Sequence, residues 1–567
     1  YSPAKLSADL QSLANFYYDH GYLGFRVVNH REIVSADKKH VSIVVTVSEG
    51  PVYTIGKIRV IGPASRSPGV HKLISLKTGD VFSRKKVMAI SKAVRSYFSD
   101  QGYARSQVIV KTQLNKASRQ VNFVFVVDNK NRIYVRRINF IGNDHSQDFA
   151  LRSWVRQMEG ARYSQKLIDE SKQKIALLPY FQLLSVQVVP VPNKPNEVDL
   201  NFNVKSRSAG QFMVQGGYAE LQKFFYTISL SQQNFMGTGK AAGISFTQSK
   251  YQQIYKINWS NPMLTLSGVS RSIALNFTKT MPTKLGLGNY DMDDMGVMFN
   301  YGIPVSVNNT LSLGFGYDYT RIKNFDATKG APPIGAYMAK YGSKYSQYKL
   351  SLGWSYQNLN KLPFPTSGVY TDLDLDMALP FGGKVNASSS KVNAIGYYRL
   401  VFDSRFYYPV GTKGFVLNPH MTVGYGGGWG KFDSLPFFMN FYGGGPNTLP
   451  GYQSSSLGPR NPNDTDNAYM GGNLETFAGL NFIFPNPISD SMRTALFVAG
   501  GNIFDTHHVA GVDYEKVSLG NMRGSVGLLV AWHIPSIATI EFAISKPVNT
   551  KPGDDKAAFG FTMGSAF

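Results

Sequence analysis

The sequence predicts small α+β modules in tandem, followed by a large antiparallel β-barrel that crosses a membrane. Two observations carry this prediction. The first 206 residues contain a repeat of about 81 residues, in which segments of helical and strand periodicity follow one another. From about Ala209 the pattern changes to alternating segments of about ten residues each, and about sixteen of them lie between residues 209 and 567.

Composition limits the classes of protein that fit. The chain has 567 residues, of which 43% are hydrophobic and 17% charged, so it is too apolar to be disordered. It contains no Cys, which excludes disulfides and thiol chemistry. No run of 18 apolar residues occurs, so no membrane-spanning helix is predicted. Because it begins at Tyr1 without a signal-peptide pattern, we expect a processed or truncated segment.

Basic residues are concentrated in one stretch. The formal net charge is +23, and residues 51–206 alone hold 26 basic and 10 acidic groups. A stretch of this kind binds nucleic acid, an anionic membrane surface or an acidic partner, and charge alone does not distinguish these three.

The repeat has the length of a small domain with its own core. A Gly-Tyr pair follows a helix-period segment twice, at Gly21 and at Gly102, 81 residues apart. Tyr53 and Tyr134 in the following segments are again 81 residues apart. The order strand, helix, helix, strand, strand indicates an α+β module. Residues 1–50 hold only the last helix and the last two strands, so we expect half a module there.

Alternation alone does not separate a membrane barrel from a soluble sandwich or propeller. Three features favour the barrel: the region lacks an obvious internal repeat, aromatic residues cluster at strand ends, and the chain stops on an alternating strand with a terminal aromatic residue. The predicted strands include Gln211–Ala219, Phe225–Gln233, Ala241–Ser249, Ser270–Thr280, Thr310–Arg321, Gln347–Tyr356, Val369–Met377 and Phe559–Phe567. Longer connections are expected at residues 322–345, 427–472 and 501–522.

No motif predicts an enzyme, a metal site or a cofactor. Asp372-Leu-Asp-Leu-Asp376 puts three carboxylates on one strand face, which fits a polar lumen wall better than a metal site. Asp291-Met-Asp-Asp294 is expected in a loop. The Gly-rich segment 424–430 lacks the Lys and Ser/Thr of a phosphate-binding loop, and His507-His508 is expected to be solvated. No nucleophile and base stand in a recognisable motif.

These features together resemble the Omp85 family of bacterial outer-membrane proteins, and most closely its β-barrel assembly factors. The resemblance rests on the tandem Gly-Tyr modules, which look like POTRA domains, and on the aromatic C-terminal strand. It also rests on the segments Tyr134–Asn143, Asn234–Gly239 and Phe441–Gly445. It covers essentially the whole chain and implies α+β POTRA modules in tandem followed by a 16-stranded antiparallel transmembrane β-barrel.

The resemblance also divides the chain. It implies the C-terminal half of a third POTRA domain at residues 1–50, a fourth at 51–128, a fifth at 129–206 and the barrel at 207–567. A long loop, residues 427–472, would fold back into the lumen.

In the family the first and last barrel strands form a seam that opens sideways. Here those strands would be Gln211–Ala219 and Phe559–Phe567, and the glycines of the last strand pack weakly. The seam residues would be Gln211, Val214, Gly216, Gly217, Phe559, Gly560, Met563, Gly564 and Phe567.

The lumen loop departs from the family pattern. The family motif Val-Arg-Gly-Phe/Tyr carries an Arg that pairs with acidic residues on the inner wall, whereas this chain has Leu449-Pro450-Gly451-Tyr452. The wall positions that we align hold Asn481 and Ala499. Because a buried charge without a partner is costly, losing the cation and the anions together is physically coherent. We expect the loop to dock in the lumen through aromatic packing and hydrogen bonds.

The function implied by the resemblance is assembly and insertion of β-barrel proteins into the bacterial outer membrane, without enzymatic chemistry and with the modules in the periplasm. The implied partners are unfolded outer-membrane protein substrates, periplasmic accessory lipoproteins and outer-membrane lipid, but no nucleic acid. Candidate docking positions for accessory subunits are Arg136, Arg137, Arg152 and Arg156. A merely solvated basic surface is the alternative for these arginines.

Three other functions fit parts of the sequence. A two-partner secretion transporter and an assembly factor of the TamA type belong to the same superfamily. A passive porin with periplasmic modules is the alternative from another class, and a lumen filled by residues 427–472 would count against it.

Overall fold

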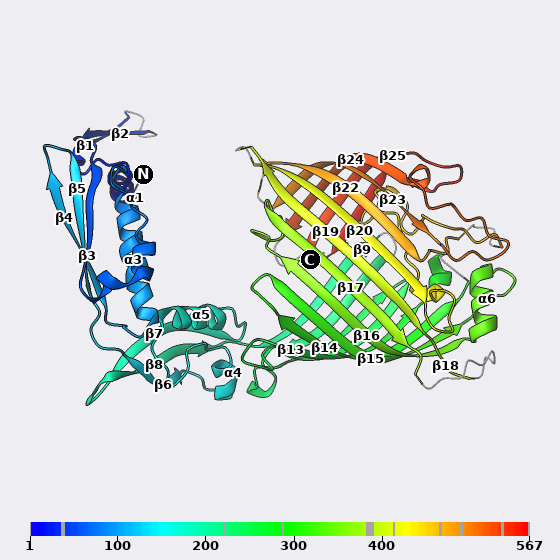
Figure 1. Ribbon diagram of the computed structural model, residues 1–567. Helices are drawn as coiled ribbons and strands as arrows, with labels where there is room; N and C mark the ends of the chain where they lie inside the picture. The colour runs from blue at the N-terminus through cyan, green and yellow to red at the C-terminus, as the bar shows by residue number, and fades with distance from the viewer. Residues whose placement is uncertain are drawn as a thin grey trace. The chain divides into compact units, whose positions relative to one another are not determined.

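The computed structural model describes residues 2–35, 40–219, 223–285, 289–381, 391–411, 414–463, 468–486, 489, 491–534 and 538–564. The chain separates into two compact units, Tyr1–Arg207 and Ser208–Phe567, which are an α+β part and a barrel (Figure 1). None of the helices in the described ranges is both long and apolar enough to cross a bilayer.

The first unit contains three successive α+β modules. The first has α1 (Pro3–Asp19), β1 (Arg26–Val34) and β2 (Val41–Ser48). The second has β3 (Thr54–Ile61), η1 (Pro63–Arg66), α2 (Pro68–Leu73), α3 (Arg84–Asp100), β4 (Gln107–Asn115) and β5 (Gln120–Asp128). The third has β6 (Tyr134–Ile141), α4 (Asp148–Arg152), α5 (Gln165–Ala176), β7 (Phe181–Val191) and β8 (Lys194–Ser206). The second and third modules therefore follow the predicted order.

Each complete module packs its helices on a three-stranded sheet. The central strand, β5 or β8, pairs in parallel with the first strand of its module and antiparallel with the strand before it. In the second module the helix-period residues Val87, Ile90 and Val94 are buried against Phe123 and Phe125 of β5. The apolar residues at helical spacing in α3 and those at alternate positions in β5 thus form one core.

The repeat shifts by one residue at the first strand of the third module. The N–H of Tyr53 donates to the carbonyl of Gly21 at 2.9 Å, and Ile133 makes the equivalent bond to Gly102 at 2.7 Å. Ile133 is buried, whereas Tyr134 is 39% exposed. The alignment of Tyr53 with Tyr134 is therefore wrong by one residue, because the chain from Gly102 to this strand is one residue shorter than in the preceding module.

One carboxylate joins each module to the next. At the end of α1, the Asp19 carboxylate accepts two hydrogen bonds. One comes from the Ser83 hydroxyl at 3.2 Å and the other from the backbone N–H of Lys85 at 2.6 Å. At the end of α3, the Asp100 carboxylate accepts the equivalent two bonds, from the Ser164 hydroxyl at 3.1 Å and from the backbone N–H of Lys166 at 2.8 Å. The two serines are the N-caps of α3 and α5. A charge at the end of one helix therefore satisfies the open N–H groups of the next.

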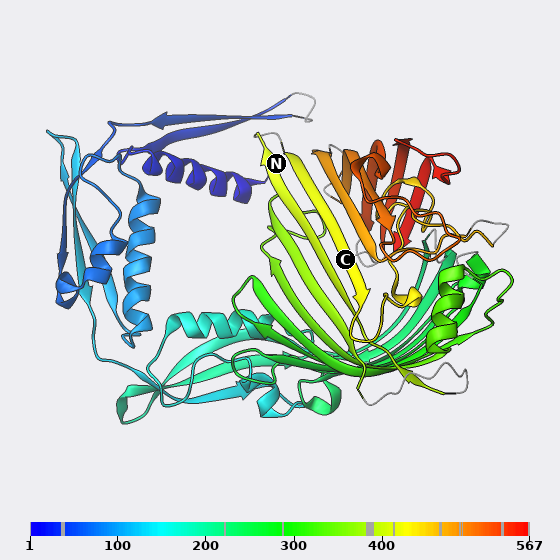
Figure 2. The ribbon, with the colours of Figure 1, turned by 45° about the vertical axis from the view of Figure 1, so that its right-hand side comes forward.

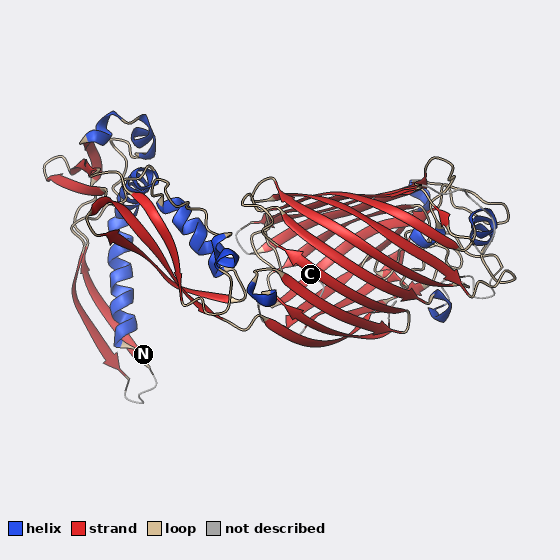
Figure 3. Cartoon of the chain, turned by 90° about the horizontal axis from the view of Figure 1, so that it is seen from below, coloured by secondary structure: helices blue, strands red, loops and turns tan. Residues whose placement is uncertain are grey.

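The second unit is a closed barrel of sixteen long antiparallel strands, which confirms the predicted fold. The strands tilt across the wall in Figures 2 and 3. Their bounds are β9 (Gly210–Ala219), β10 (Lys223–Gln232), β11 (Ala241–Ser249), β12 (Gln252–Asn261), β13 (Ser270–Thr280), β14 (Asp291–Pro304), β15 (Asn309–Lys323), β16 (Lys344–Gln357), β17 (Gly368–Leu379), β19 (Tyr397–Val410), β20 (Phe415–Gly428), β22 (Leu474–Phe484), β23 (Met492–Phe504), β24 (Arg523–Ile534), β25 (Ala538–Val548) and β27 (Phe559–Gly564).

Short elements lie in the connections. They are α6 (Pro332–Tyr341), η2 (Phe235–Gly237), η3 (Pro282–Leu285), η4 (Phe437–Met439), η5 (Leu519–Asn521), β18 (Asn393–Ala394), β21 (Gly451–Tyr452) and β26 (Lys556–Ala557). Exposure alternates along the wall: in β23, Leu496 and Val498 are 51% and 50% exposed, whereas Phe497 and Ala499 are buried. Because side chains alternate between the two faces of a barrel strand, the buried pair faces the lumen.

Asp291–Asp294 does not lie in a loop, as expected from sequence, but begins β14. Its acidic residues face basic and polar residues of β15 across the ladder, and Asp293 forms an ion pair with Lys323. Three acidic residues close together in sequence favour a loop when considered alone. In the barrel the basic and polar residues of β15 lie opposite them and allow a strand.

Substituting Asp100 should loosen the junction before α5. In Asp100→Ala the hydroxyl of Ser164 and the N–H of Lys166 lose their acceptor, a change that costs about 1 kcal/mol for a helix cap. We expect hydrogen exchange in the first turn of α5 to become roughly five- to tenfold faster in the full chain. Asp144→Ala removes an exposed carboxylate of the module that contains α5 and is the control. Equal exchange in both variants would show that Asp100 does not hold the junction.

Candidate functional site

The barrel closes where its first strand meets its last. On one side β9 pairs with β10 through ten residue pairs, from Lys223–Ala219 to Gln232–Gly210. On the other side, among the described residues, it shares one registered pair with β27, Tyr218 opposite Met563. Within the described residues this junction therefore shows fewer registered pairs than the β9–β10 junction, and in the register of Tyr218 with Met563 the residues that would face Gly216 to Val214 are 565–567, which lie outside the described residues.

The predicted seam residues fall on these two strands. Gln211, Val214, Gly216 and Gly217 lie in β9, and Phe559, Gly560, Met563 and Gly564 lie in β27. Phe567 lies outside the described residues. Gly217 is a point of close approach, because a Cβ there would come within 2.8 Å of the Met563 carbonyl oxygen. Tyr218 and Phe561 also approach across the junction, with ring centroids 6.0 Å apart.

The long loop between β20 and β22 is buried inside the barrel. Phe441, Leu449 and Tyr452 are at most 2% exposed. They form one apolar cluster with Leu457 and with wall residues, among them Ala499. Because Ala499 faces the lumen, these loop residues lie in the lumen too.

Gly451 allows the loop motif its close approach to the wall. Its φ is +104°, which favours Gly, and a Cβ there would lie 3.2 Å from the Cβ of Ser525 in β24. Tyr452 follows and donates its hydroxyl to the carbonyl of Val548 at 3.1 Å. Burial raises the pKa of Tyr452 to about 12, so the hydroxyl stays protonated and able to donate. A neutral hydrogen bond therefore anchors the motif.

The two aligned wall positions behave differently. Ala499 contributes to the apolar cluster around the loop, whereas Asn481 donates its amide to Asn418 on the neighbouring strand at 3.1 Å. The cation that meets the loop comes from the wall: the Arg399 guanidinium of β19 lies 4.2 Å from the ring centroid of Phe441. A wall cation on a loop aromatic ring is the reverse of the polarity of the family motif.

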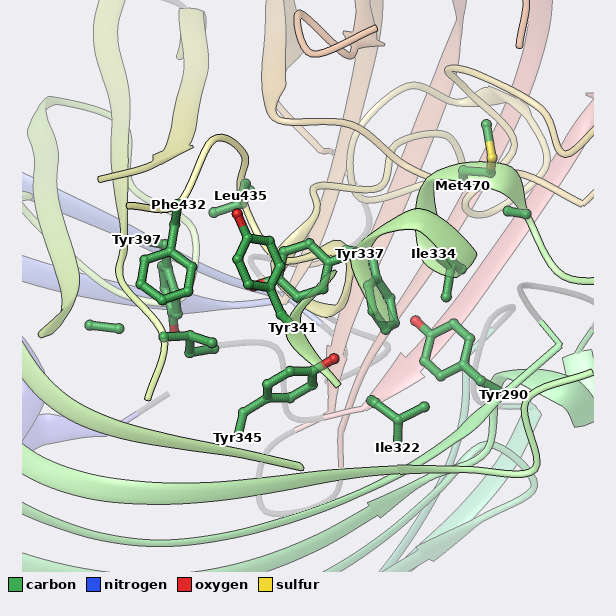
Figure 4. Close-up of a cluster of buried hydrophobic side chains, with 14 residues drawn as sticks. Tyr290, Ile322, Ile334, Tyr337, Tyr341, Tyr345, Tyr397, Phe432, Leu435 and Met470 are labelled. Atoms are coloured by element: carbon green, nitrogen blue, oxygen red, sulfur yellow. The ribbon is translucent and has the colours of Figure 1, made fainter. Parts of the chain in front are cut away.

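A second aromatic cluster covers the lumen loop near α6. Tyr337 and Tyr341 of α6 pack with Tyr345, Phe432 and Phe437, as Figure 4 shows for the labelled members. Lys340 of α6 also forms an ion pair with Asp433 of the loop. The connection 322–345 was expected only as a long loop. Its helix closes over residues that are distant in sequence, so sequence periodicity alone did not reveal the contact.

The four candidate docking arginines lie in the third module. Arg136 makes two hydrogen bonds to Asp199, at 2.9 and 2.5 Å. This pairing holds the pKa of the Asp199 carboxyl below its ordinary value, so the ion pair persists above that value and is lost as pH falls. Arg152 is paired with Asp148 and Glu159.

The other two arginines differ from this pair. Arg137 is exposed beside Arg136. Arg156 is half-buried, and its N–H donates to the Ser171 hydroxyl at 2.8 Å. Arg136 and Arg152 are therefore held by ion pairs within the module, whereas Arg137 is exposed.

A closed antiparallel β-barrel with a loop packed in its lumen, preceded by α+β modules, is the class of protein that this fold defines. A sequence model described as the Omp85 superfamily domain matches residues 234–567. The POTRA model, described as a surface antigen variable number repeat, matches residues 1–50, 53–130 and 133–207. The chain belongs to the Omp85 superfamily, which confirms the resemblance.

Relatives extend this match over the whole chain. The outer membrane protein assembly factor BamA of Neisseria meningitidis serogroup B is 27% identical over 100% of this chain and 73% of its own length. BamA of Buchnera aphidicola is 28% identical over 57% of this chain and 53% of its own length. The crystal structure of BamA from Haemophilus ducreyi lacking POTRA domains 1–3 is 25% identical, covers 90% of this chain and superposes with a TM-score of 0.74.

Truncating the central loop aromatic should destabilise the barrel. Phe441 is 2% exposed, so Phe441→Ala leaves a cavity and removes the ring beneath Arg399. A buried Phe→Ala change costs about 3–5 kcal/mol. We expect a lower temperature for conversion of the compact band to the unfolded band on a gel. Leu519→Ala, at a position 87% exposed, should leave that temperature unchanged. If the two variants convert together, the packing of Phe441 does not stabilise the barrel.

Proposed function

We propose that the chain assembles and inserts β-barrel proteins into the bacterial outer membrane, with its POTRA modules in the periplasm. Three BamA relatives that align with nearly all of this chain are named outer membrane protein assembly factors. The sparse pairing of β9 with β27 is the observation that carries the mechanism. Insertion by this mechanism requires no enzymatic step, because folding of the substrate supplies the free energy.

The obstacle to insertion is the backbone of the substrate. An unpaired N–H or C=O group costs several kcal/mol in hydrocarbon. An edge that offers partners lowers this cost, and β9 can offer one along its β27 side. We infer that the terminal strand of an unfolded substrate adds to β9 by strand addition.

Strand lengths support a second contribution from the lipid. Near the junction β9, β10 and β11 have 10, 10 and 9 residues, whereas β14, β15 and β16 have 14, 15 and 14. At about 3.3 Å per residue and a tilt of about 40°, ten residues span about 25 Å and fourteen about 35 Å. A shorter wall favours a thinner bilayer beside it, which eases insertion of a new strand.

The partners follow from this function. Unfolded outer-membrane proteins are the substrates, outer-membrane lipid surrounds the barrel, and periplasmic accessory lipoproteins dock on the POTRA modules. The exposed Arg137, with Arg136, Arg152 and Arg156 around it, is the docking position that we favour. A passive porin fits less well, because the loop 427–472 buries its aromatic residues in the lumen.

A disulfide across the junction tests the mechanism. We expect Tyr218→Cys/Met563→Cys, once oxidised, to lose at least tenfold of its activity in folding an unfolded porin in proteoliposomes that contain the copurifying partners. Reductant should restore the activity. The readout is the heat-dependent gel shift of the porin. Because the chain has no native Cys, the engineered pair is the only one that can form.

A second disulfide controls for cross-linking itself. Thr227 and Thr247 are registered partners in β10 and β11, with their hydroxyls 2.8 Å apart. Thr227→Cys/Thr247→Cys links strands that are already paired and should leave assembly unchanged. Full activity of the junction pair with its disulfide completely formed would rule out lateral opening.

Charge reversal tests the docking position. Arg137→Glu should reduce the accessory subunits that copurify with the full-length protein by severalfold, because it replaces an exposed cation with an anion. Lys57 is the matched control, since it is the exposed basic residue at the equivalent place in the preceding module. Equal recovery of partners with Arg137→Glu and Lys57→Glu would remove Arg137 from the docking surface.

A further inference from the structure

The connection between the last two barrel strands, residues 549–558, pairs with the lumen loop. Within the barrel unit, β21 of the loop and β26 of this connection form a small antiparallel sheet, with Gly451 opposite Ala557 and Tyr452 opposite Lys556. The pairing continues one residue further, where the N–H of Gln453 donates to the carbonyl of Asp555 at 3.0 Å. The loop thus supplies main-chain partners directly before β27 begins.

Side chains of the lumen loop extend this contact. The Tyr469 hydroxyl donates to the Asp555 carboxylate at 3.0 Å, and the Ser456 hydroxyl lies 3.4 Å from the Asp555 carbonyl. Arg460 donates to the carbonyl of Gly553. With the bond from Tyr452 to Val548 at the end of β25, the lumen loop contacts the strand before the connection and the second half of the connection itself, from Gly553 to Ala557.

The barrel wall holds the same connection from the other side. Arg523 at the start of β24 donates two hydrogen bonds to Asp554, at 2.9 and 3.0 Å, and two to Glu515. The side chains of Arg523 and Asp554 are 7% and 6% exposed. A buried pair of this geometry tolerates little displacement, because separating it leaves a buried charge alone.

The lumen loop also contacts the last strand itself. A Cβ at Gly560, the second residue of β27, would lie 2.7 Å from the Cγ of Pro446. Only a residue without a side chain allows this approach. β27 is therefore held by six residue pairs with β25, by the lumen loop and by one registered pair with β9.

We propose that the lumen loop and Arg523 form a latch that fixes the register of the last strand at the seam. The latch comprises residues 446–460, residues 549–558 and Arg523. A Gly-containing strand that shows one registered pair with its neighbour within the described residues can slip by two residues without changing faces. Holding the connection through both the lumen loop and Arg523 prevents that slip and keeps Met563 opposite Tyr218. Tyr452, Arg523 and Asp554 are positioning residues in this arrangement, which rests on the proposed function of the seam.

Two disulfide reporters measure the register without any substrate. Tyr218→Cys/Met563→Cys traps the register seen here, and Tyr218→Cys/Phe561→Cys traps a slip of two residues. The ratio of the two oxidation rates in the full-length protein in vesicles is the readout. We expect this ratio to fall at least fivefold when the latch is broken. A gel shift of each variant checks that the barrel has folded.

Two variants break the latch, and each has a matched control. Gly451→Ala introduces a Cβ at φ +104° beside Ser525, whereas Gly430→Ala, in the same loop at φ +71°, meets no atom within 4 Å. Asp554→Asn removes the charge that Arg523 binds, whereas Asp513→Asn removes an exposed carboxylate nearby. We expect the ratio to fall in the first member of each pair and to remain unchanged in the second.

An unchanged ratio in both latch variants would overturn the proposal, and so would an equal fall in the controls. The result is independent of the assembly assay. A changed register with normal assembly would keep the latch and refute the seam mechanism. An unchanged register combined with loss of activity in the locked protein would keep the seam and refute the latch.

Discussion

Closure of the sheet is the constraint on which the barrel depends. In hydrocarbon every backbone N–H and C=O group needs a partner, and a sheet meets that demand only when its two edges join. Within the described residues the other junctions meet it with ladders of several pairs, such as the ten pairs between β9 and β10 and the six between β25 and β27. The last junction retains one registered pair among the described residues. That difference in pairing is the physical basis for proposing that substrate strands enter there.

A barrel of sixteen strands encloses more space than its own wall side chains fill, and here the lumen loop occupies part of it. Burying a long loop is costly unless its polar groups find partners. This loop meets the requirement mostly without formal charge: Tyr452 donates to Val548, and β21 pairs with β26. Two wall arginines add charge beside the loop, Arg399 above the Phe441 ring and Arg523 beside Asp554 of the connection before β27. The loop is thus held by a distributed set of contacts rather than by one ion pair.

Periodicity predicted the elements of this fold because it reports burial directly. Val87, Ile90 and Val94 lie on one helix face, and about sixteen alternating segments predicted the sixteen long strands. Contacts between distant segments have no such signal. Three such contacts depend on topology. They are the packing of α6 on Phe432, the ion pair of Asp293 with Lys323, and the hydrogen bonds of Arg523 with Asp554. The resemblance supplied the two strands at the junction, but not the register between them.

The junctions between modules and the junction between the first and last barrel strands are held by different kinds of contact. In the modules, Asp19 and Asp100 each occupy the N-terminus of the next helix, so the junctions are specific and formed by the same atoms twice. In the barrel, the described residues of the first and last strands share one registered pair, and the connection before β27 carries further specific contacts. Because these contacts are made by the connection and not by β9, they leave the edge of β9 free to pair with another strand in the proposed mechanism. If β27 closes the barrel and also releases β9, as proposed above, its register must be fixed by groups other than β9, and the contacts of the lumen loop with residues 553–557 meet that requirement.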